Sequence, residues 1–145
     1  MTQNINLASL TTSQGISIYG ANGEEKSYII PGDSSGHSVK EAGDVNGDGF
    51  ADVIIGAPNA NNYAGISYVI YGGTSLSTID LSNLNPTQGF SISSSEINAN
   101  NGNSVSGAGD VNGDGYDDII VGPQIQPMAV LAMSFMAMFS YLILS

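Results

Sequence analysis

Ala42-Gly-Asp-Val-Asn-Gly-Asp-Gly-Phe50 organises the whole chain, because it returns almost unchanged as Ala108-Gly-Asp-Val-Asn-Gly-Asp-Gly-Tyr116. The equivalent residues Asp44 and Asp110 lie 66 positions apart. The likeness continues on both sides, where Ser-Val precedes each copy, and an aspartate, three apolar residues and a glycine closely follow it. The chain therefore contains a tandem repeat of one structural unit.

A second pair of matching segments lies farther upstream in each unit. Residues 5–10 and 14–18 match residues 79–84 and 88–92, but here the offset is 74 positions, so the first copy carries eight more residues before its acidic stretch. Insertions are tolerated best in exposed loops, so we expect a longer surface loop around Glu24–Asp33.

Each unit is predicted to consist of about four short β-strands. The candidate segments are rich in β-branched and aromatic residues, or alternate between apolar and polar residues, and glycines bound them. Four strands per unit and no sustained helical period before Pro127 favour an all-β fold of radial repeats, such as the blades of a propeller. A β-sandwich with a duplicated hairpin is the alternative. The predicted strands lie at Gly65–Gly72, Val53–Ile55, residues 15–18 and 89–92, Ser38-Val39 and Ser104-Val105.

Oxygen-bearing side chains recur at positions 1, 3, 5 and 9 of each acidic stretch. Ca²⁺ is a hard cation that takes six to eight oxygen ligands at about 2.3–2.6 Å, and a short loop supplies them by curling around the ion. Glycine at position 6 permits the sharp turn, and the backbone carbonyl at position 7 can add a ligand. We therefore predict two calcium sites. The first consists of Asp44, Asn46, Asp48, the Phe50 carbonyl and Asp52, and the second of Asp110, Asn112, Asp114, the Tyr116 carbonyl and Asp118.

The two acidic loops differ from EF-hand loops, because position 12 is Ile55 or Val121 instead of glutamate and the flanks are predicted strands. The alternative is that their Asn-Gly and Asp-Gly pairs only form hairpin turns. Two copies with the same four oxygen positions favour a metal. Each loop carries a formal charge of about −3, which is costly without a cation. Asp117 adjoins Asp118, but the first copy has Ala51 there, so Asp118 is the preferred ligand.

These residues resemble the FG-GAP repeat, the blade unit of integrin alpha-chain propellers and of related bacterial surface proteins. The resemblance rests on the acidic loop and on Gly56-Ala57-Pro58 at the expected separation, and it covers about residues 1–123. It implies blades of four antiparallel strands, a ring of about seven blades, and calcium that rigidifies the hairpin between strands. Where Phe-Gly is usual in the family, this chain has Ser35-Gly36-His37 in the first copy and Asn101-Gly102-Asn103 in the second. The second copy also reads Gly122-Pro123, without the alanine.

The resemblance divides the chain into three parts. Residues 1–73 form a first repeat unit, residues 74–123 an incomplete second unit, and residues 124–145 an atypical apolar tail. Two blades cannot close a ring, and their unpaired edges invite association. We therefore expect further propeller blades as partners, either in a longer chain or in a second copy of this one.

The tail breaks with the rest of the chain, since only Ser134 and Ser140 are polar between Met128 and Leu144. Three interpretations are open. The tail could be a membrane anchor, because as a helix it would span about 26 Å, at the lower limit of the bilayer thickness. The absence of flanking Lys or Arg argues against an anchor. The tail could instead be a buried helix or strand pair, for which Met is a suitable filler. It could also be a shifted reading frame, because each Met-Ala read one base earlier gives Asn, Asp, His or Tyr followed by Gly.

Composition excludes several classes of function. The chain has 13 acidic and 2 basic residues and a net charge of −11, which excludes a nucleic acid partner and argues against docking on anionic membranes. A membrane would be a partner only through the tail. The absence of cysteine excludes disulfides, thiolate catalysis and cysteine-based zinc sites. Hydrophobic residues make up 41% of the chain, enough for a packed core.

No catalytic constellation is visible, so we predict that the chain is not an enzyme. His37 is the one histidine and its repeat equivalent is Asn103, there is no Gly-x-Ser-x-Gly elbow, and the acids gather in the loops. We expect a calcium-binding, integrin-alpha-like propeller module for extracellular adhesion, with a protein or glycan as ligand. The alternative is a non-catalytic, calcium-stabilised scaffold of a larger secreted hydrolase. An extracellular or cell-surface location is expected, although no signal peptide is visible.

Overall fold

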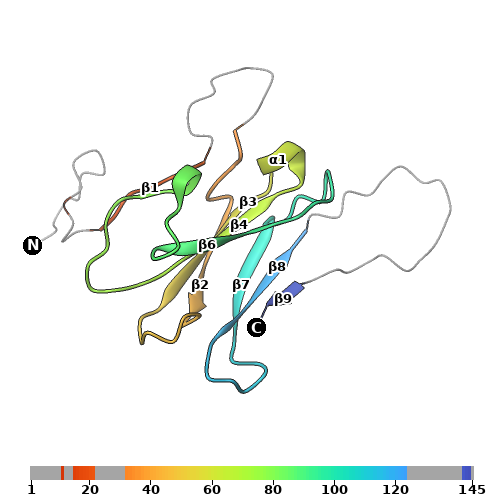
Figure 1. The fold of residues 1–145 in the computed structure, drawn as a ribbon. Helices are drawn as coiled ribbons and strands as arrows, with labels where there is room; N and C mark the ends of the chain where they lie inside the picture. The colour runs from red at the N-terminus through yellow and green to blue at the C-terminus, as the bar shows by residue number, and fades with distance from the viewer. Residues whose placement is uncertain (1–10, 12–14, 22–31, 124–141, 145) are drawn as a thin grey trace, which may run out of the picture.

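The computed structural model describes residues 11, 15–21, 32–123 and 142–144. These residues form a four-stranded sheet, a three-stranded sheet and a pair of very short strands (Figure 1). The two larger sheets are antiparallel throughout and, in the described part of the chain, do not close into a barrel. The predicted all-β class is confirmed, and the arrangement is that of partial propeller blades.

The first sheet has the strand order β2-β3-β4-β6. Residues directly opposite one another share a face of the sheet, so Ile54, Val69 and Phe90 lie on one side. Neighbouring residues of β3 and β4 point to opposite sides, and both sides are apolar, as the run Val53–Ile55 predicts. The strands are β2 (Ser38–Gly43), β3 (Asp52–Ala57), β4 (Ile66–Ile70) and β6 (Gly89–Ser93).

The second sheet contains β7 (Ser104–Gly109), β8 (Asp118–Gly122) and β9 (Leu142–Leu144). The β7–β8 pair reproduces the β2–β3 pair, including an irregular register just before the loop. Its third strand, β9, comes from the end of the predicted tail and pairs with β8. The described part of this sheet therefore has three strands, where the resemblance implies four.

The predicted strand at residues 15–18 does not join the first sheet. β1 is only Ile18–Tyr19, and it pairs in parallel with β5 (Ile79–Asp80). Residues 15–18 correspond in the repeat to β6, which is the last strand of a sheet and pairs with a strand upstream of it. Because β2, β3, β4 and β6 already fill the first sheet, the segment is left outside.

The boundaries of the first sheet do not coincide with the boundaries of the sequence repeat. The first sheet runs from Ser38 to Ser93 and takes β6 from beyond residue 73, where the first repeat unit was expected to end. The division into residues 1–73, 74–123 and 124–145 stays a proposal about the repeat and does not describe the boundaries of the sheets.

Two short turns connect the strands. α1 (Ala60–Tyr63) lies between β3 and β4 and is a single turn in which Asn61 and Asn62 have left-handed φ angles of 51° and 55°. Asparagine tolerates this region because its short polar side chain bonds locally. The 3₁₀ turn η2 (Leu81–Asn83) begins at Asp80, whose carboxylate accepts hydrogen bonds from the Ser82 hydroxyl and the Ser82 N–H. These two bonds, the hydroxyl bond most of all, lower the pKa of Asp80 below its usual value.

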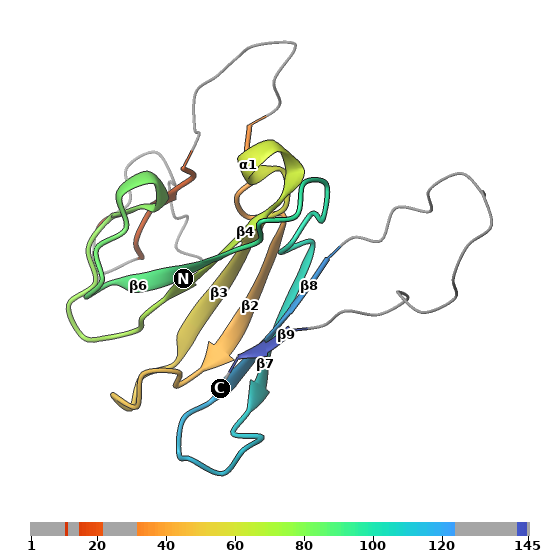
Figure 2. The same cartoon turned by 45° about the vertical axis from the view of Figure 1, so that its right-hand side comes forward.

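Two apolar clusters flank the first sheet. One lies between the two sheets, where β2 runs beside β7 (Figures 1 and 2), and the other lies on the opposite face and includes residues of β5 and η2. The first sheet is thus covered on both sides, and the second is held to it by apolar packing. The inter-sheet cluster is Ala42, Ile54, Val69, Val105, Ile119 and Val121, and the outer cluster is Ile55, Ala57, Ala60, Tyr68, Ile70, Ile79 and Leu81.

Parts of two sequence predictions lie outside the described residues, namely residues 24–31 of the predicted loop and residues 124–141 and 145 of the tail. For residues 124–141 and 145 the three interpretations of the tail stay open, whereas residues 142–144 form the strand β9 and are not part of a helix. Asp33, expected on the surface, is only 6% exposed and accepts hydrogen bonds from the Ser35 backbone and hydroxyl. Among the described residues, no helix is long and apolar enough to cross a membrane.

Ser67 on β4 offers a first prediction. In the described part of the chain its buried hydroxyl oxygen has no hydrogen-bond partner, and it faces the backbone of Gly102. An unpaired buried polar group costs about 1–3 kcal/mol. Ser67→Ala is therefore expected to leave the free energy of unfolding unchanged or to raise it by about 1 kcal/mol. Urea unfolding measures this, and a loss above 1 kcal/mol would contradict it.

Candidate metal centre

The loop between β2 and β3 curls around the side chain of its first residue. The Asp44 carboxylate accepts the N–H of Asp48 at 3.0 Å on Oδ1 and that of Gly49 at 2.8 Å on Oδ2. Asn46 Oδ1 also accepts the Asp48 N–H at 3.0 Å, and Asp48 Oδ1 accepts the Phe50 N–H at 2.9 Å. The oxygens at positions 1, 3 and 5 are thus all turned toward the loop backbone.

The loop between β7 and β8 repeats these four hydrogen bonds and has one more, from the Gly113 N–H to Asp110 Oδ1 at 2.7 Å. The Asp110 carboxylate accepts the Asp114 N–H at 3.1 Å on Oδ1 and the Gly115 N–H at 2.9 Å on Oδ2. Asn112 Oδ1 accepts the Asp114 N–H at 2.7 Å, and Asp114 Oδ1 accepts the Tyr116 N–H at 2.9 Å. The two loops therefore fold alike, and they lie at the same end of the molecule (Figures 1 and 2).

Asp52, at position 9, is a buried strand residue. Its Oδ2 accepts the Val45 N–H at 2.9 Å and its Oδ1 accepts the Gly72 N–H at 2.8 Å, which ties the start of the loop to the end of β4. Burial raises the pKa of the Asp52 carboxyl above its usual value, although these two N–H bonds oppose the rise. Asp118 is equally buried, and its Oδ2 accepts the Val111 N–H at 2.8 Å.

Phe50 and Tyr116, at position 7, carry side chains that are 41% and 49% exposed. They were predicted to contribute backbone carbonyls, and that role stays a prediction. His37 is exposed, as expected of a loop residue.

The donor atoms suit calcium, but the carboxylates are not gathered around one point. Within the described residues, no three carboxylate or imidazole groups form a cluster that could hold a metal ion as it stands. Each loop nevertheless combines three carboxylates and one amide, all hard oxygen donors of the kind Ca²⁺ takes. Each carboxylate oxygen has two lone pairs, so an oxygen that accepts one backbone N–H can still bind an ion. The residues therefore fit calcium by their chemistry.

A contact between the two loops was not foreseen from the sequence. Asp117 Oδ2 accepts the Asp44 N–H at 2.7 Å, and the Asp117 N–H donates to the Asp44 carbonyl at 3.0 Å. The Tyr116 ring lies over Gly47, where an added Cβ would be 2.5 Å from Cε1. The sequence places Asp117 beside the predicted ligand Asp118, but it carries no signal for a bond to a residue 73 positions away.

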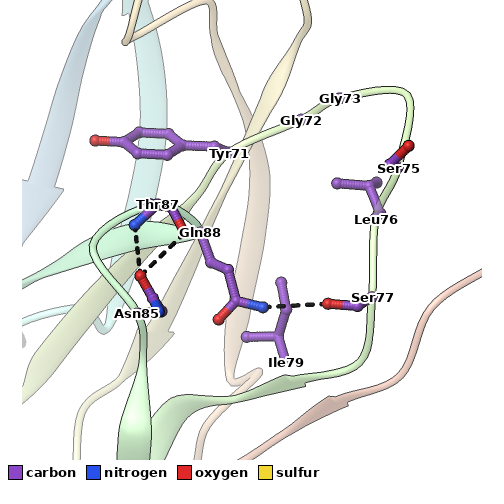
Figure 3. Close-up of a pocket in the computed structure, with 10 residues that line it drawn as sticks. All are labelled: Tyr71, Gly72, Gly73, Ser75, Leu76, Ser77, Ile79, Asn85, Thr87 and Gln88. Carbon is purple, nitrogen blue, oxygen red and sulfur yellow. Dashed lines mark hydrogen bonds between the residues drawn. The ribbon is translucent and has the colours of Figure 1, made fainter.

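A hollow of about 400 Å³ lies beside the β4–β5 connection (Figure 3). Its side chains are neutral, and three hydrogen bonds drawn in Figure 3 stabilise its rim, from Gln88 Nε2 to Ser77 Oγ at 3.4 Å and from the N–H and Oγ1 of Thr87 to Asn85 Oδ1, both at 2.9 Å. No carboxylate lines it, so it adds nothing to the metal centre.

Comparison with known proteins agrees with the resemblance seen in the sequence. The FG-GAP repeat family matches residues 41–70 and 101–122. The chain is similar to integrin alpha pat-2 of Caenorhabditis briggsae, 41% identical over 106 residues, and of Caenorhabditis elegans, 41% identical over 105 residues. Each match covers 67% of this chain but only 8% of the relative. Integrin alpha-X of Mus musculus is 36% identical over 90 residues, 60% of this chain and 7% of its own length.

Proposed function

We propose that this chain is part of an integrin-alpha-like propeller module with two calcium sites. The premise is that both acidic loops lie within the stretches that match the FG-GAP repeat. The single observation that carries the proposal is the equivalence of the two loops. Both have the same oxygen donors and share four backbone hydrogen bonds, although they belong to different sheets. A pair of coincidental turns would not need to agree in this way.

Calcium would supply positive charge where each loop concentrates three carboxylates. Asp44, Asn46 and Asp48 would hold the first ion together with Asp52 and the Phe50 carbonyl. The equivalent residues of the second loop, ending at Asp118 and with the Tyr116 carbonyl, would hold the second. Such ligand counts fit the millimolar calcium found outside cells better than nanomolar cytosolic levels.

Calcium is expected to stabilise the protein. At a free concentration of about 100 times the dissociation constant, one site contributes about 2.7 kcal/mol. The melting temperature in excess calcium should therefore exceed that in a calcium chelator by several degrees. Asp48→Ala and Asp114→Ala should each remove one part of the shift, and the double variant should remove all of it.

Glu96→Gln is the matched control, because it also removes one negative charge but from an exposed residue outside both loops. Its calcium-dependent shift should equal that of the unmodified chain. Equal melting temperatures with and without calcium in the unmodified chain would refute the proposed sites.

We further propose that the module lies at the cell surface or outside the cell, where it binds a protein or glycan ligand and associates with further blades. The relatives named above are animal integrins, and kinship to bacterial surface proteins stays a prediction. We assign no catalytic role to the chain. The second candidate, a calcium-stabilised scaffold of a secreted hydrolase, would be favoured by a hydrolase domain encoded beside it in the gene, whereas further repeats would favour adhesion.

A further inference from the structure

The hydrogen bond between the two loops links Asp117, which lies between two predicted ligands of the second site, to Asp44, the first predicted ligand of the first site. Asp117 stands between positions 7 and 9 of the second loop, so both of its chain neighbours, Tyr116 and Asp118, are predicted to contact the second ion. Its own carboxylate accepts the Asp44 N–H, at 2.7 Å. Asp44 is position 1 of the first loop, and its side chain is the one around which that loop curls.

The contact constrains the Asp44 backbone on both sides. The Asp44 N–H donates to Asp117, and the Asp44 carbonyl accepts the Asp117 N–H at 3.0 Å. Gly43, which precedes Asp44, has a φ of +81°, and an added Cβ there would overlap the Asp117 carboxylate. The Tyr116 ring covers Gly47 in the middle of the same loop. The second loop thus packs on the first at its beginning and at its centre.

From these contacts we infer that Asp117 couples the two calcium loops, so that an ion in the second loop strengthens binding in the first. The inference rests on the proposed calcium sites. An ion bound to the second loop would order residues 116–118, and the ordered Asp117 would hold the Asp44 backbone in place. The first loop would then lose less conformational entropy when it binds its own ion, which is positive cooperativity. Asp117 is a positioning residue, because it acts through Asp44.

The chain itself supplies the variants for a test. Ala51 occupies the position equivalent to Asp117 in the first loop, so alanine is compatible with a loop of this kind. Asp117→Ala removes both the charge and the acceptor oxygen. Asp117→Asn removes the same charge but keeps an oxygen that can accept the Asp44 N–H. The difference between the two variants therefore isolates the hydrogen bond from the electrostatic attraction for calcium.

A double-mutant cycle measures the coupling by calorimetric titration with calcium. Disabling the second loop with Asp114→Ala should weaken calcium binding in the first loop by about tenfold. The same change made in the Asp117→Ala protein should weaken it by less than about twofold, since the coupling is already lost. With Asp117→Asn the tenfold effect should be largely restored. Equal losses in all three backgrounds would overturn the coupling.

A second measurement needs no change at Asp117. In the Asp48→Ala protein calcium can bind only the second loop, and the Asp44 amide resonance should nevertheless shift on titration, because its N–H donates to Asp117. An unmoved Asp44 amide, with the second-loop resonances shifted, would overturn the coupling alone. Absence of any calcium heat or shift in the unmodified chain would refute the calcium sites as well.

Discussion

Asp52→Ala is expected to lower the free energy of unfolding by about 2 kcal/mol or more even without calcium, because it leaves two partly buried N–H groups without their acceptor. The Asp52 carboxylate is fully buried, and it bonds to Val45 on the loop and to Gly72 after β4. Alanine would leave both N–H groups unsatisfied beside a cavity. Urea unfolding in a calcium chelator measures the loss without any contribution from the ion.

Asp118→Ala is the matched comparison within the repeat. Asp118 is as buried as Asp52, but among the described residues the structure gives its carboxylate one backbone donor, Val111. Its substitution should therefore cost less than that of Asp52. Asp48→Ala, at an exposed position, should cost about 1 kcal/mol or less under the same conditions. A loss below 1 kcal/mol for Asp52→Ala would contradict the predicted structural role of its carboxylate.

Gly56→Ala is expected to lower the free energy of unfolding by about 3 kcal/mol or more, because it weakens the contact between the two sheets. The added Cβ would meet rigid backbone, which cannot move aside as a flexible side chain could. An added Cβ at Gly56 would overlap the carbonyl oxygen of Gly102 and crowd Ser38 Oγ. Ser38 Oγ donates to that same carbonyl at 2.8 Å. The segment that contains Gly102 must then move away from the first sheet.

That movement would break the other bonds of the same segment. The Asn100 N–H donates to the Tyr63 carbonyl at 2.8 Å, and the Asn101 N–H donates to the Ala64 carbonyl at 3.0 Å. Gly36→Ala is a suitable control, because a Cβ there meets nothing within 4 Å and only its φ of +87° is strained, which costs about 1 kcal/mol. Urea unfolding of the two variants would contradict the prediction if both lost the same stability.

The local part of the fold and of the candidate site could be predicted from the sequence. Sequence pattern located β2, β3, β4, β6 and β7, the repeat of the β3 sequence marks the position of β8, and the spacing of oxygens and glycines located both loops. These signals are readable because the relevant interactions join residues close in sequence. Asp44 bonds to residues four and five positions ahead, and Asp48 to a residue two positions ahead.

The contacts between the sheets were decided by the tertiary structure alone. The bond from Asp44 to Asp117, the packing of Gly102 on Gly56 and the exclusion of residues 15–18 from the first sheet each depend on which strands pair and which faces meet. Pattern and spacing describe only the neighbourhood of a residue along the chain, whereas these contacts join residues tens of positions apart. The sequence by itself therefore determined where the strands and the two acidic loops lie, and only the packing of one sheet on the other decided that the loops touch.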